Sequence, residues 1–162
     1  MGAALFVGFL IAQRLAELVI AKRNTARLRA EGAVEHGAGH YPAIVALHAS
    51  WIAAIAIWGW GAPVHPGWLA AFAVLQGLRL WVLLTLGPRW TTRILTVPGE
   101  RLVARGPFKL IPHPNYAVVV AEMVVAPMVL GLVWVAVLWG AANVVLLWFV
   151  RIPAEERALG LR

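Results

Sequence analysis

The sequence predicts an all-α integral membrane protein with about five transmembrane helices, and three observations support this fold class. Of the 162 residues, 62% are hydrophobic and only 13% are charged, whereas soluble domains carry about 25% charged residues. The mean hydropathy is +0.80. The apolar residues also form runs of the roughly 20 residues that a helix needs to cross about 30 Å of hydrocarbon. This composition excludes disordered, fibrous and disulfide-rich secreted proteins.

Two residue types are missing, and this narrows the possible chemistry. The chain has no cysteine, which excludes disulfides, thiolate metal sites and cysteine nucleophiles. It also has no aspartate, so its seven glutamates are the only carboxylate side chains. The net charge of +7 does not indicate nucleic-acid binding, because the basic residues lie between apolar runs and are not gathered on a soluble face.

The first three apolar runs predict three spanning helices. Residues 2–21 contain only two charged side chains, Arg14 and Glu17. They lack the basic start and the cleavage site of a signal peptide, so we expect this first helix to be retained. Residues 42–60 and 67–87 form the second and third predicted spans. The Gly- and Pro-rich residues 61–66 between them predict a short turn.

The last apolar run predicts a helical hairpin. Residues 116–150 would extend about 52 Å as a single helix at 1.5 Å per residue, which is too long for one span and slightly short for two. We therefore expect a tight turn near residues 127–131, with one arm short or strongly tilted. A connector of residues 88–115 precedes this hairpin.

The basic residues predict the orientation, because cytoplasmic loops of membrane proteins are enriched in Lys and Arg. The loop after the first span, the connector and the C-terminal tail hold twelve basic residues, whereas the other two turns hold none. We therefore expect the N-terminus outside the cell membrane and the connector and C-terminus in the cytoplasm. The twelve residues are Lys22, Arg23, Arg27, Arg29, Arg89, Arg93, Arg101, Arg105, Lys109, Arg151, Arg157 and Arg162.

Polar side chains inside the spans need a partner or a function, because an ionisable group costs at least about 2.5 kcal/mol at the bilayer centre. By spacing, all of them fall in the cytoplasmic half. Arg14 and Glu17 are one turn apart and are expected to neutralise each other. The pattern fits a polar cavity open to the cytoplasm as well as a set of interhelical hydrogen bonds. The other members are His48, Gln76, Arg79, Glu122 and Asn143.

The connector ends in its most restricted stretch, residues 97–116, VPGERLVARGPFKLIPHPNY. Pro112 and Pro114 favour extended backbone at Ile111 and His113. Pro114 suits the first position of a helix, which leaves His113 just before it. A helix N-terminus at the membrane surface can bind an anion or a carboxylate. The alternative is an interfacial connector whose Lys and Arg contact lipid phosphates.

The exit of the last span, residues 151–157, is the second candidate. Pro153 removes a helical hydrogen bond and leaves a backbone carbonyl near Phe149 free. Arg151 and Glu155 are four residues apart, where they could form only a surface pair worth about a few tenths of a kcal/mol. Adjacent carboxylates beside an arginine also suit a zwitterionic ligand, since they attract an ammonium or sulfonium while the guanidinium takes a carboxylate.

At these two motifs the sequence resembles the isoprenylcysteine carboxyl methyltransferase family. That family combines a Gly-Pro-aromatic turn with a following basic residue, an Arg-His-Pro-x-Tyr box that opens a helical hairpin, and an Arg-x-x-x-Glu-Glu box at its end. Residues 106–109, 113–116 and 151–156 match these motifs in order, and the resemblance covers about residues 98–159. One position departs from the pattern: Pro112 replaces the usual Arg, whose contacts must come from Lys109 or Arg105 or are absent.

The resemblance implies a membrane enzyme that takes a methyl group from S-adenosylmethionine, leaving S-adenosylhomocysteine, without a Rossmann fold. The chain has no G-x-G-x-x-G motif after a strand. By similarity, residues 1–162 form one domain, with a three-helix part at 1–87, a cofactor-binding part at 88–162, and an active site facing the cytoplasm. The resemblance assigns the cofactor to His113, Tyr116, Glu155, Glu156 and Lys109.

The resemblance also suggests the acceptor side of the reaction. Arg151 would lie between cofactor and substrate, with Asn115 and Arg79 as further substrate contacts. Residues 89–99, together with Asn115 and Glu122, look most like the bacterial branch that accompanies type III polyketide synthases and methylates long-chain alkylpyrones or alkylresorcinols. We expect such a lipophilic acceptor to enter from the bilayer, with membrane lipids as the other partners and no role for nucleic acid.

The acceptor decides whether a base is needed. A carboxylate, as in prenylcysteine, is already ionised and needs only orientation by Arg151. A phenol or enol hydroxyl must lose its proton, and Glu122 or His113 is then the expected acceptor of that proton. Arg151 and Glu122 are therefore the expected catalytic residues. The alternative for Glu122 is a packing role, paired with Arg79.

Other functions remain open at the level of sequence. A phospholipid N-methyltransferase relative would use the same cofactor on an amine, and a reductase relative would need NADPH. In a membrane scaffold or transporter subunit, the Arg–Glu pairs would only hold helices together. His36 and His40 are four residues apart in a Gly-rich loop, but no third ligand accompanies them, so we expect no metal site.

Overall fold

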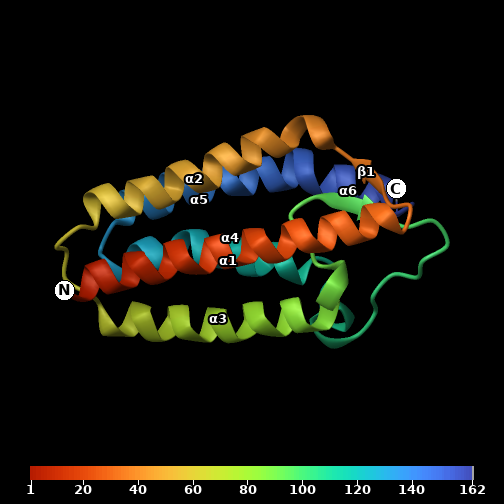
Figure 1. The fold of residues 1–162 in the computed structure, drawn as a ribbon. Helices are drawn as coiled ribbons and strands as arrows, with labels where there is room; N and C mark the ends of the chain where they lie inside the picture. Colours follow the sequence, from red (N-terminus) through yellow and green to blue (C-terminus); the bar gives the residue numbers. More distant parts are fainter. Residues whose placement is uncertain (162) are drawn as a thin grey trace.

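The computed structural model describes residues 1–161 and confirms an all-α integral membrane protein. Helices run alternately between two ends of the molecule (Figure 1). Four segments are long and apolar enough to cross a membrane, and the helix Pro114–Val129 is a shorter apolar one. The helices are α1 (Gly2–Ala30), α2 (Tyr41–Trp58), α3 (Pro66–Leu86), α4 (Pro114–Val129), α5 (Val133–Leu146) and α6 (Ile152–Ala158).

The first helix is longer than its apolar run, and this differs from the predicted end at residue 21. It continues to Ala30 before Gly32 turns the chain with φ +88. The added residues KRNTARLRA are rich in Lys, Arg, Ala and Leu, which favour helix. The loss of hydropathy therefore marks where the helix leaves the expected span and not where it ends.

The predicted hairpin at the end of the chain is confirmed. Helix α4 ends at Val129 and α5 begins at Val133. Gly131 has φ +70, and the Leu132 N–H closes the turn by donating to the Pro127 carbonyl at 3.0 Å. With 16 residues, α4 is the short arm that the length of the apolar run required.

Two short strands were not predicted. Strand β1 (Val34–His36) pairs antiparallel with β2 (Ile94–Thr96), with Glu35 opposite Leu95. Three-residue strands are too short to produce a readable alternating pattern. The pairing ties the loop after α1 to the connector, and the Glu35 carboxylate holds Arg29 and Arg93 there. Both basic loops and the C-terminal region thus lie at the end opposite the N-terminus (Figure 1).

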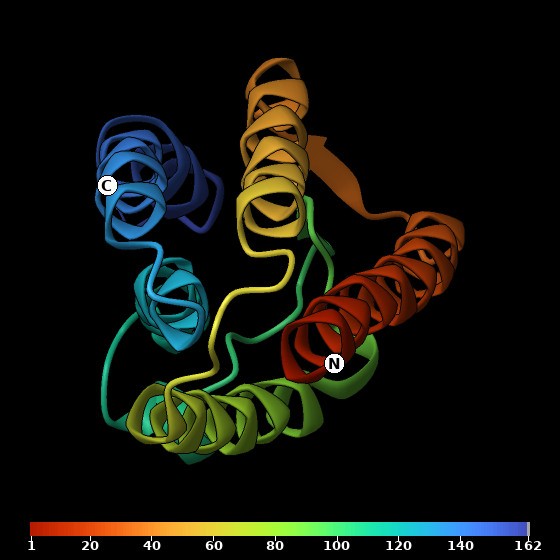
Figure 2. The ribbon, with the colours of Figure 1, turned by 90° about the vertical axis from the view of Figure 1, so that its left-hand side faces the viewer.

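The connector and the last helices contain further short turns. Three 3₁₀ turns lie at Ala38–His40, Gly87–Arg89 and Gly106–Lys109, and a π-helical turn lies at Leu147–Arg151 between α5 and α6. Viewed from the N-terminal end, α4 lies between α3 and α5, and α1 lies across the bundle from α5 (Figure 2).

The hydrophobic core fills the half of the bundle near the N-terminus. It consists of the first half of α1, the end of α2, the start of α3 and the α4–α5 turn, and Trp51 Nε1 joins two of these elements by donating to the Met123 carbonyl at 3.3 Å. The other half of the bundle contains the polar residues and a cavity. Large core residues are Phe6, Leu10, Trp51, Ile55, Phe72, Met123, Val129 and Val135.

Candidate active site

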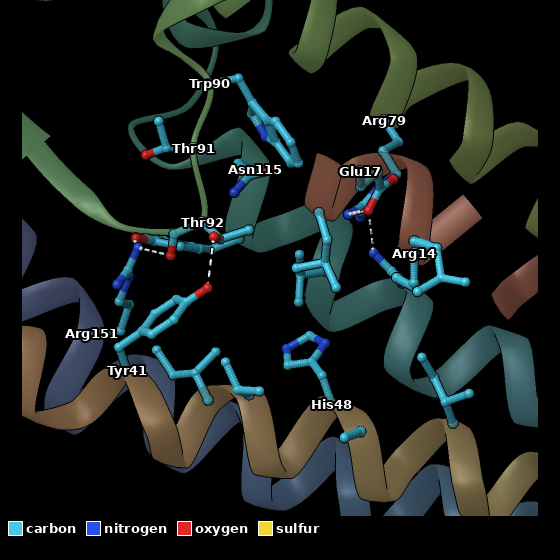
Figure 3. Close-up of a pocket in the computed structure, with 18 of the residues that line it drawn as sticks. Arg14, Glu17, Tyr41, His48, Arg79, Trp90, Thr91, Thr92, Asn115 and Arg151 are labelled. Carbon is cyan, nitrogen blue, oxygen red and sulfur yellow. Dashed lines mark hydrogen bonds and ion pairs between the residues drawn. The ribbon is translucent and has the colours of Figure 1, made fainter. Parts of the chain in front are cut away.

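A cavity of about 280 Å³ lies between α1, α2 and α4, below the connector residues that precede β2. Its rim is formed by apolar side chains of α1 and α2 that are exposed on the outside of the bundle, with Leu15 59% and Val45 46% exposed. Polar side chains lie deeper, from α1, α3, α4 and the connector (Figure 3). The cavity therefore joins an apolar lateral opening to polar groups inside the bundle.

One wall of the cavity is a hydrogen-bonded cluster centred on Tyr116. The Tyr116 hydroxyl donates to the Glu155 carboxylate and accepts a hydrogen bond from Arg151 Nε at 3.0 Å. Arg151 Nη2 donates to the Thr92 carbonyl at 3.0 Å, and the Thr92 hydroxyl pairs with the Tyr41 hydroxyl at 2.9 Å. Residues far apart in the sequence, from α2, the connector, α4 and α6, are thus held in one network.

His113 connects this cluster to the second carboxylate. Its Nδ1 lies 3.6 Å from Glu155 and its Nε2 lies 3.5 Å from Glu156. Its ring stacks on Tyr116 with centroids 5.5 Å apart. The hydrogen bond to Glu155 raises the pKa of His113 above its ordinary value, with Glu156 adding to this, although partial burial acts in the opposite direction. The family resemblance assigned His113, Tyr116, Glu155 and Glu156 to one pocket, and the structure brings these four side chains together.

Proline positions His113 as predicted, with one difference in backbone angle. Helix α4 begins at Pro114, and His113 precedes it as the N-cap. Its φ of −126 and ψ of 63 are not the extended conformation expected before proline. The His113 carbonyl accepts the N–H groups of Tyr116 and Ala117 at 3.1 and 3.2 Å, which draws the backbone toward the helix.

The carbonyl predicted to be freed by Pro153 corresponds to the π-helical turn. Pro153 has no N–H to donate to Phe149, and the Ile152 N–H instead reaches the Leu147 carbonyl, five residues back. The wider turn changes the side-chain spacing that an α-helix would give. Arg151 is consequently buried and bonds Tyr116 and not Glu155, which argues against the alternative of a simple i,i+4 surface pair. The two side chains meet through the Tyr116 hydroxyl.

A second polar group, which we call the ion quartet, lies at the inner end of the cavity. It consists of Arg14, Glu17, Arg79 and Glu122. Arg14 bonds Glu17 at 2.9 Å and Glu122 at 2.8 Å. Arg79 bonds the same two carboxylates from α3. Two positive and two negative charges balance, and the quartet joins α1, α3 and α4.

These contacts correct the expectation that Arg14 and Glu17 satisfy only each other. Glu122 is fully buried and also accepts from Gln76 Nε2 at 2.8 Å. They support the alternative for Glu122, a packing carboxylate paired with Arg79. The two explanations of the polar pattern, a cavity and interhelical hydrogen bonds, therefore both apply, and Arg14 and Arg79 belong to each.

The remaining predicted residues divide into two groups. Asn115 and Arg79, which the resemblance assigned to the substrate, line the cavity together with Arg151. Lys109 lies exposed on the turn Gly106–Lys109 and has no hydrogen bond to the Tyr116 cluster within residues 1–161. Arg105 donates to the Thr85 carbonyl at 3.3 Å. Neither basic residue thus replaces the Arg that Pro112 displaces.

On α2, sequence reasoning identified only His48, as one of the polar residues that a cavity would explain, and it missed the rest of this wall. Tyr41, Val45, His48 and Ile52 recur at helical spacing and line one side of the cavity. Apart from His48, this stripe is the only sequence signal for the wall, and in an apolar span it does not differ from ordinary helix packing. Among these, His48 is the polar residue farthest from the connector.

The second part of the chain matches a known protein family. The sequence model of the isoprenylcysteine carboxyl methyltransferase family matches residues 68–160, from α3 to the end of α6. The chain belongs to this family. The match begins within α3, earlier than the resemblance at residues 98–159 suggested. It includes both the connector and the hairpin.

A relative matches nearly the whole chain. This member of the isoprenylcysteine carboxyl methyltransferase family is 40% identical to "Uncharacterized protein YpbQ" of Bacillus subtilis (strain 168) over 162 residues. The match covers 96% of this chain and 95% of the relative. No solved structure matches the chain. Within residues 1–161 no three His or Glu side chains are placed to hold a metal ion, and His36 instead pairs with the Thr96 hydroxyl at 2.8 Å.

Proposed function

We propose that the protein transfers a methyl group from S-adenosylmethionine to an oxygen atom of a lipophilic acceptor that enters from the bilayer. The observation that carries this proposal is that Tyr116 and Arg151 belong both to the carboxylate cluster and to the wall of the cavity with an apolar opening. A water-soluble cofactor and a lipid acceptor can thus approach the same two side chains from different directions.

The residues of the Tyr116 cluster fit the charges of S-adenosylmethionine, which carries an ammonium, a carboxylate and a sulfonium. Glu155 and Glu156 lie side by side around His113 and offer carboxylates to a cation. The bonds from Arg151 to Tyr116 and Thr92 use two of the five N–H donors of its guanidinium. The other donors are suited to a carboxylate or to the acceptor oxygen. The bound cofactor supplies an electrophilic methyl group for in-line displacement.

The chain's own contribution is chiefly alignment and the exclusion of water, because transfer from a sulfonium neutralises charge. Arg151 is held by two bonds and is only 6% exposed, so its guanidinium has a fixed position. Asn115 lies on the first turn of α4 beside it and lines the same cavity. The apolar side chains of α1 and α2 keep the acceptor tail out of water.

The acceptor class that we propose is a long-chain phenol or pyrone hydroxyl, or a prenylcysteine-like carboxylate. The resemblance to the bacterial branch described above favours the hydroxyl. We further propose that the site faces the cytoplasm. The basic loop that holds β1 lies at the same end of the molecule as α6 (Figure 1), and α6 supplies Glu155 to the Tyr116 cluster.

The test is binding of S-adenosylhomocysteine to the detergent-purified protein, measured by calorimetry. Wild type should bind with micromolar affinity, and Glu155→Gln and His113→Ala should weaken binding at least about tenfold, since each removes a charged contact. Glu31→Gln is the matched control, because Glu31 lies at the exposed end of α1 and pairs with Arg27 at 3.6 Å. Its affinity should equal that of wild type.

Two other outcomes would replace the proposal. Absence of binding to a folded wild-type sample freed of carried-over cofactor supports a scaffold or, if NADPH binds instead, a reductase. Methylation of a phospholipid amine in a headgroup assay, with no product from hydroxyl or carboxylate acceptors, assigns the N-methyltransferase function.

A further inference from the structure

His48 is a polar side chain in the cavity that the proposed mechanism does not yet use. It projects from α2 into the space between the Tyr41–Arg151 side and the Arg14 side (Figure 3). Within residues 1–161 it forms no hydrogen bond or ion pair, whereas the other charged residues around it are paired with one another. An imidazole in an apolar span without a partner is costly, which indicates that it serves a ligand.

The depth of His48 follows from its place on α2. Helices α2 and α4 both start at the connector end and run toward the N-terminal end (Figure 1). His48 lies seven residues after Tyr41, the first residue of α2, which is about 10 Å along the helix at 1.5 Å per residue. Trp51, one turn further along α2, belongs to the hydrophobic core and donates to the Met123 carbonyl of α4. His48 therefore lies between the Tyr41 end of the cavity and the hydrophobic core.

The direction of the side chain favours contact with a bound acceptor. Side chains on a helix incline toward its N-terminus, and the N-terminus of α2 is the end that holds Tyr41 and the Tyr116 cluster. Arg151 and His48 line the same cavity, and so do the apolar side chains of Val119 and Ile44.

The charged groups that face His48 belong to the ion quartet. Arg14 and Glu17 face it from α1 and Arg79 faces it from α3, and all three line the same cavity. Glu122 completes the quartet from α4 but is fully buried. Because the quartet is balanced and internally bonded, these carboxylates are committed to guanidinium groups. His48 is the side chain in this part of the cavity whose ring nitrogens have no hydrogen-bond partner within residues 1–161.

We propose that His48 binds the hydroxyl of a phenolic acceptor and takes its proton during methyl transfer. This inference rests on the proposed function and names the acceptor chemistry, a neutral hydroxyl. The O–H bond breaks and its proton moves to the imidazole. The acceptor oxygen bonds the methyl carbon, and the carbon–sulfur electron pair returns to the sulfur. The imidazolium releases its proton to water after the product leaves.

This assignment differs from the two bases considered from the sequence. Glu122 is fully buried within the ion quartet. His113 lies between Glu155 and Glu156, where it is part of the cofactor cluster. A phenol has a pKa of about 10, as in tyrosine, so a hydroxyl acceptor of this kind is neutral when it binds and requires a base.

Binding provides the first test, and it does not depend on turnover. Affinity for a long-chain alkylresorcinol is measured by calorimetry on the S-adenosylhomocysteine complex. His48→Leu should weaken this affinity about tenfold, and His48→Gln, which can still hydrogen bond, should stay within about threefold of wild type. The O,O-dimethyl ether of the same compound has no hydroxyl to donate. Its affinity should therefore stay within about threefold of wild type in both variants.

Turnover provides the second test, with the acidity of the acceptor as the variable. His48→Gln should lower kcat about 100-fold with an alkylresorcinol, because glutamine cannot take the proton. With ring-fluorinated analogues of the same chain length the loss should shrink as the phenol becomes more acidic. Ser50→Ala is the control on α2, because Ser50 bonds Trp139 of α5 and does not line the cavity.

Each result decides the inference. Equal turnover in His48→Gln and wild type overturns it, and so does a loss that is the same for every acceptor acidity, which would make His48 a positioning residue. Methylation of carboxylate acceptors alone overturns it while leaving the proposed function intact. Failure of wild type to bind S-adenosylhomocysteine overturns the proposed function and this inference with it. Unchanged S-adenosylhomocysteine affinity in both variants shows that they are folded.

Discussion

His113 lies between two carboxylates at the mouth of the cluster, and this makes the fold sensitive to pH. Because its pKa in the folded protein is raised above about 6.5, its protonated form stabilises the fold. That contribution is fully present below pH 6.5, the approximate unfolded value, and is lost as the pH rises through the raised folded value. The direction is opposite to the one that a buried, unpaired histidine would show.

The first prediction concerns this sign. The difference in Tm between wild type and His113→Asn should be largest below about pH 6.5 and should shrink as the pH is raised. Thermal unfolding in detergent, from about pH 5.5 to about pH 9, measures this difference in Tm. Glu155→Gln should reduce the pH dependence, because Glu155 is the largest cause of the raised pKa. A difference that grows with pH would contradict the assignment of a protonated His113.

At this scale the sequence identified most of the cluster and missed its surroundings. The resemblance to the methyltransferase family assigned His113, Tyr116 and Glu155 to one pocket, because the two motifs that carry it are short and local. The sequence did not place Tyr41, and it marked His48 only as a polar residue that a cavity or interhelical hydrogen bonds would explain. The positions of both depend on how α2 packs against the connector and α4. Packing between helices is a non-local property, and a single polar residue in an apolar run does not reveal its neighbours.

The ion quartet acts between elements, since it holds α1, α3 and α4 together in the part of the bundle that the hydrophobic core does not fill. Removing one member of a buried, balanced group leaves an uncompensated charge, which is more costly than removing a whole pair. The cavity beside it depends on this arrangement, because Arg14 and Arg79 form part of the cavity wall.

The second prediction follows from the charge balance. Arg79→Met should lower the free energy of unfolding by about 3–5 kcal/mol, measured by titration with SDS in detergent micelles. The double variant Arg79→Met, Glu122→Gln restores neutrality and should recover a large part of that loss. Arg89→Met is the exposed control, since its pair with Glu100 lies at the surface and is worth about 1 kcal/mol or less. Simple addition of the two losses would contradict a coupled quartet.

Among the elements, the sequence predicted the helices well and their ends less well. Apolar length and the Gly and Pro residues predicted four long segments and a short hairpin arm, because bilayer thickness fixes how many residues a span needs. It did not predict the continuation of α1 to Ala30, the β1–β2 pair or the π-helical turn. The continuation of α1 depends on helix propensity outside the membrane. The β1–β2 pair depends on contacts between distant residues, such as Glu35 and Arg93, which are 58 residues apart. The π-helical turn depends on the N–H that Pro153 lacks.

For the whole molecule, the two ends differ in composition. The strand β1, helix α6 and the end of α1 share one end of the molecule, opposite the N-terminus (Figure 1), and the Tyr116 cluster includes Glu155 of α6. The hydrophobic core lies in the half of the bundle near the N-terminus. This asymmetry matches the orientation predicted from the twelve basic residues, of which Arg162 lies outside the described residues. Which end faces the cytoplasm stays a prediction.

The third prediction tests this orientation and uses the absence of cysteine in the chain. Pro63→Cys, in the turn after α2, should react with a membrane-impermeant maleimide on intact cells. Ala104→Cys, in the connector, should react only after the cells are opened. Both positions are exposed, so access to the reagent and not burial decides the result. The reverse pattern would place the site outside the cell.

The ion quartet also sets an order of events during synthesis. Chains are made from the N-terminus, so α1 with Arg14 and Glu17 is complete before Arg79, which pairs with Glu17 across 62 residues. Glu122, the other partner of Arg14, follows 108 residues after it. During that interval the i,i+3 pair within α1 is what neutralises the two charges. The first helix therefore enters the membrane with an ion pair that the finished protein keeps and to which Glu122 and Arg79 are added.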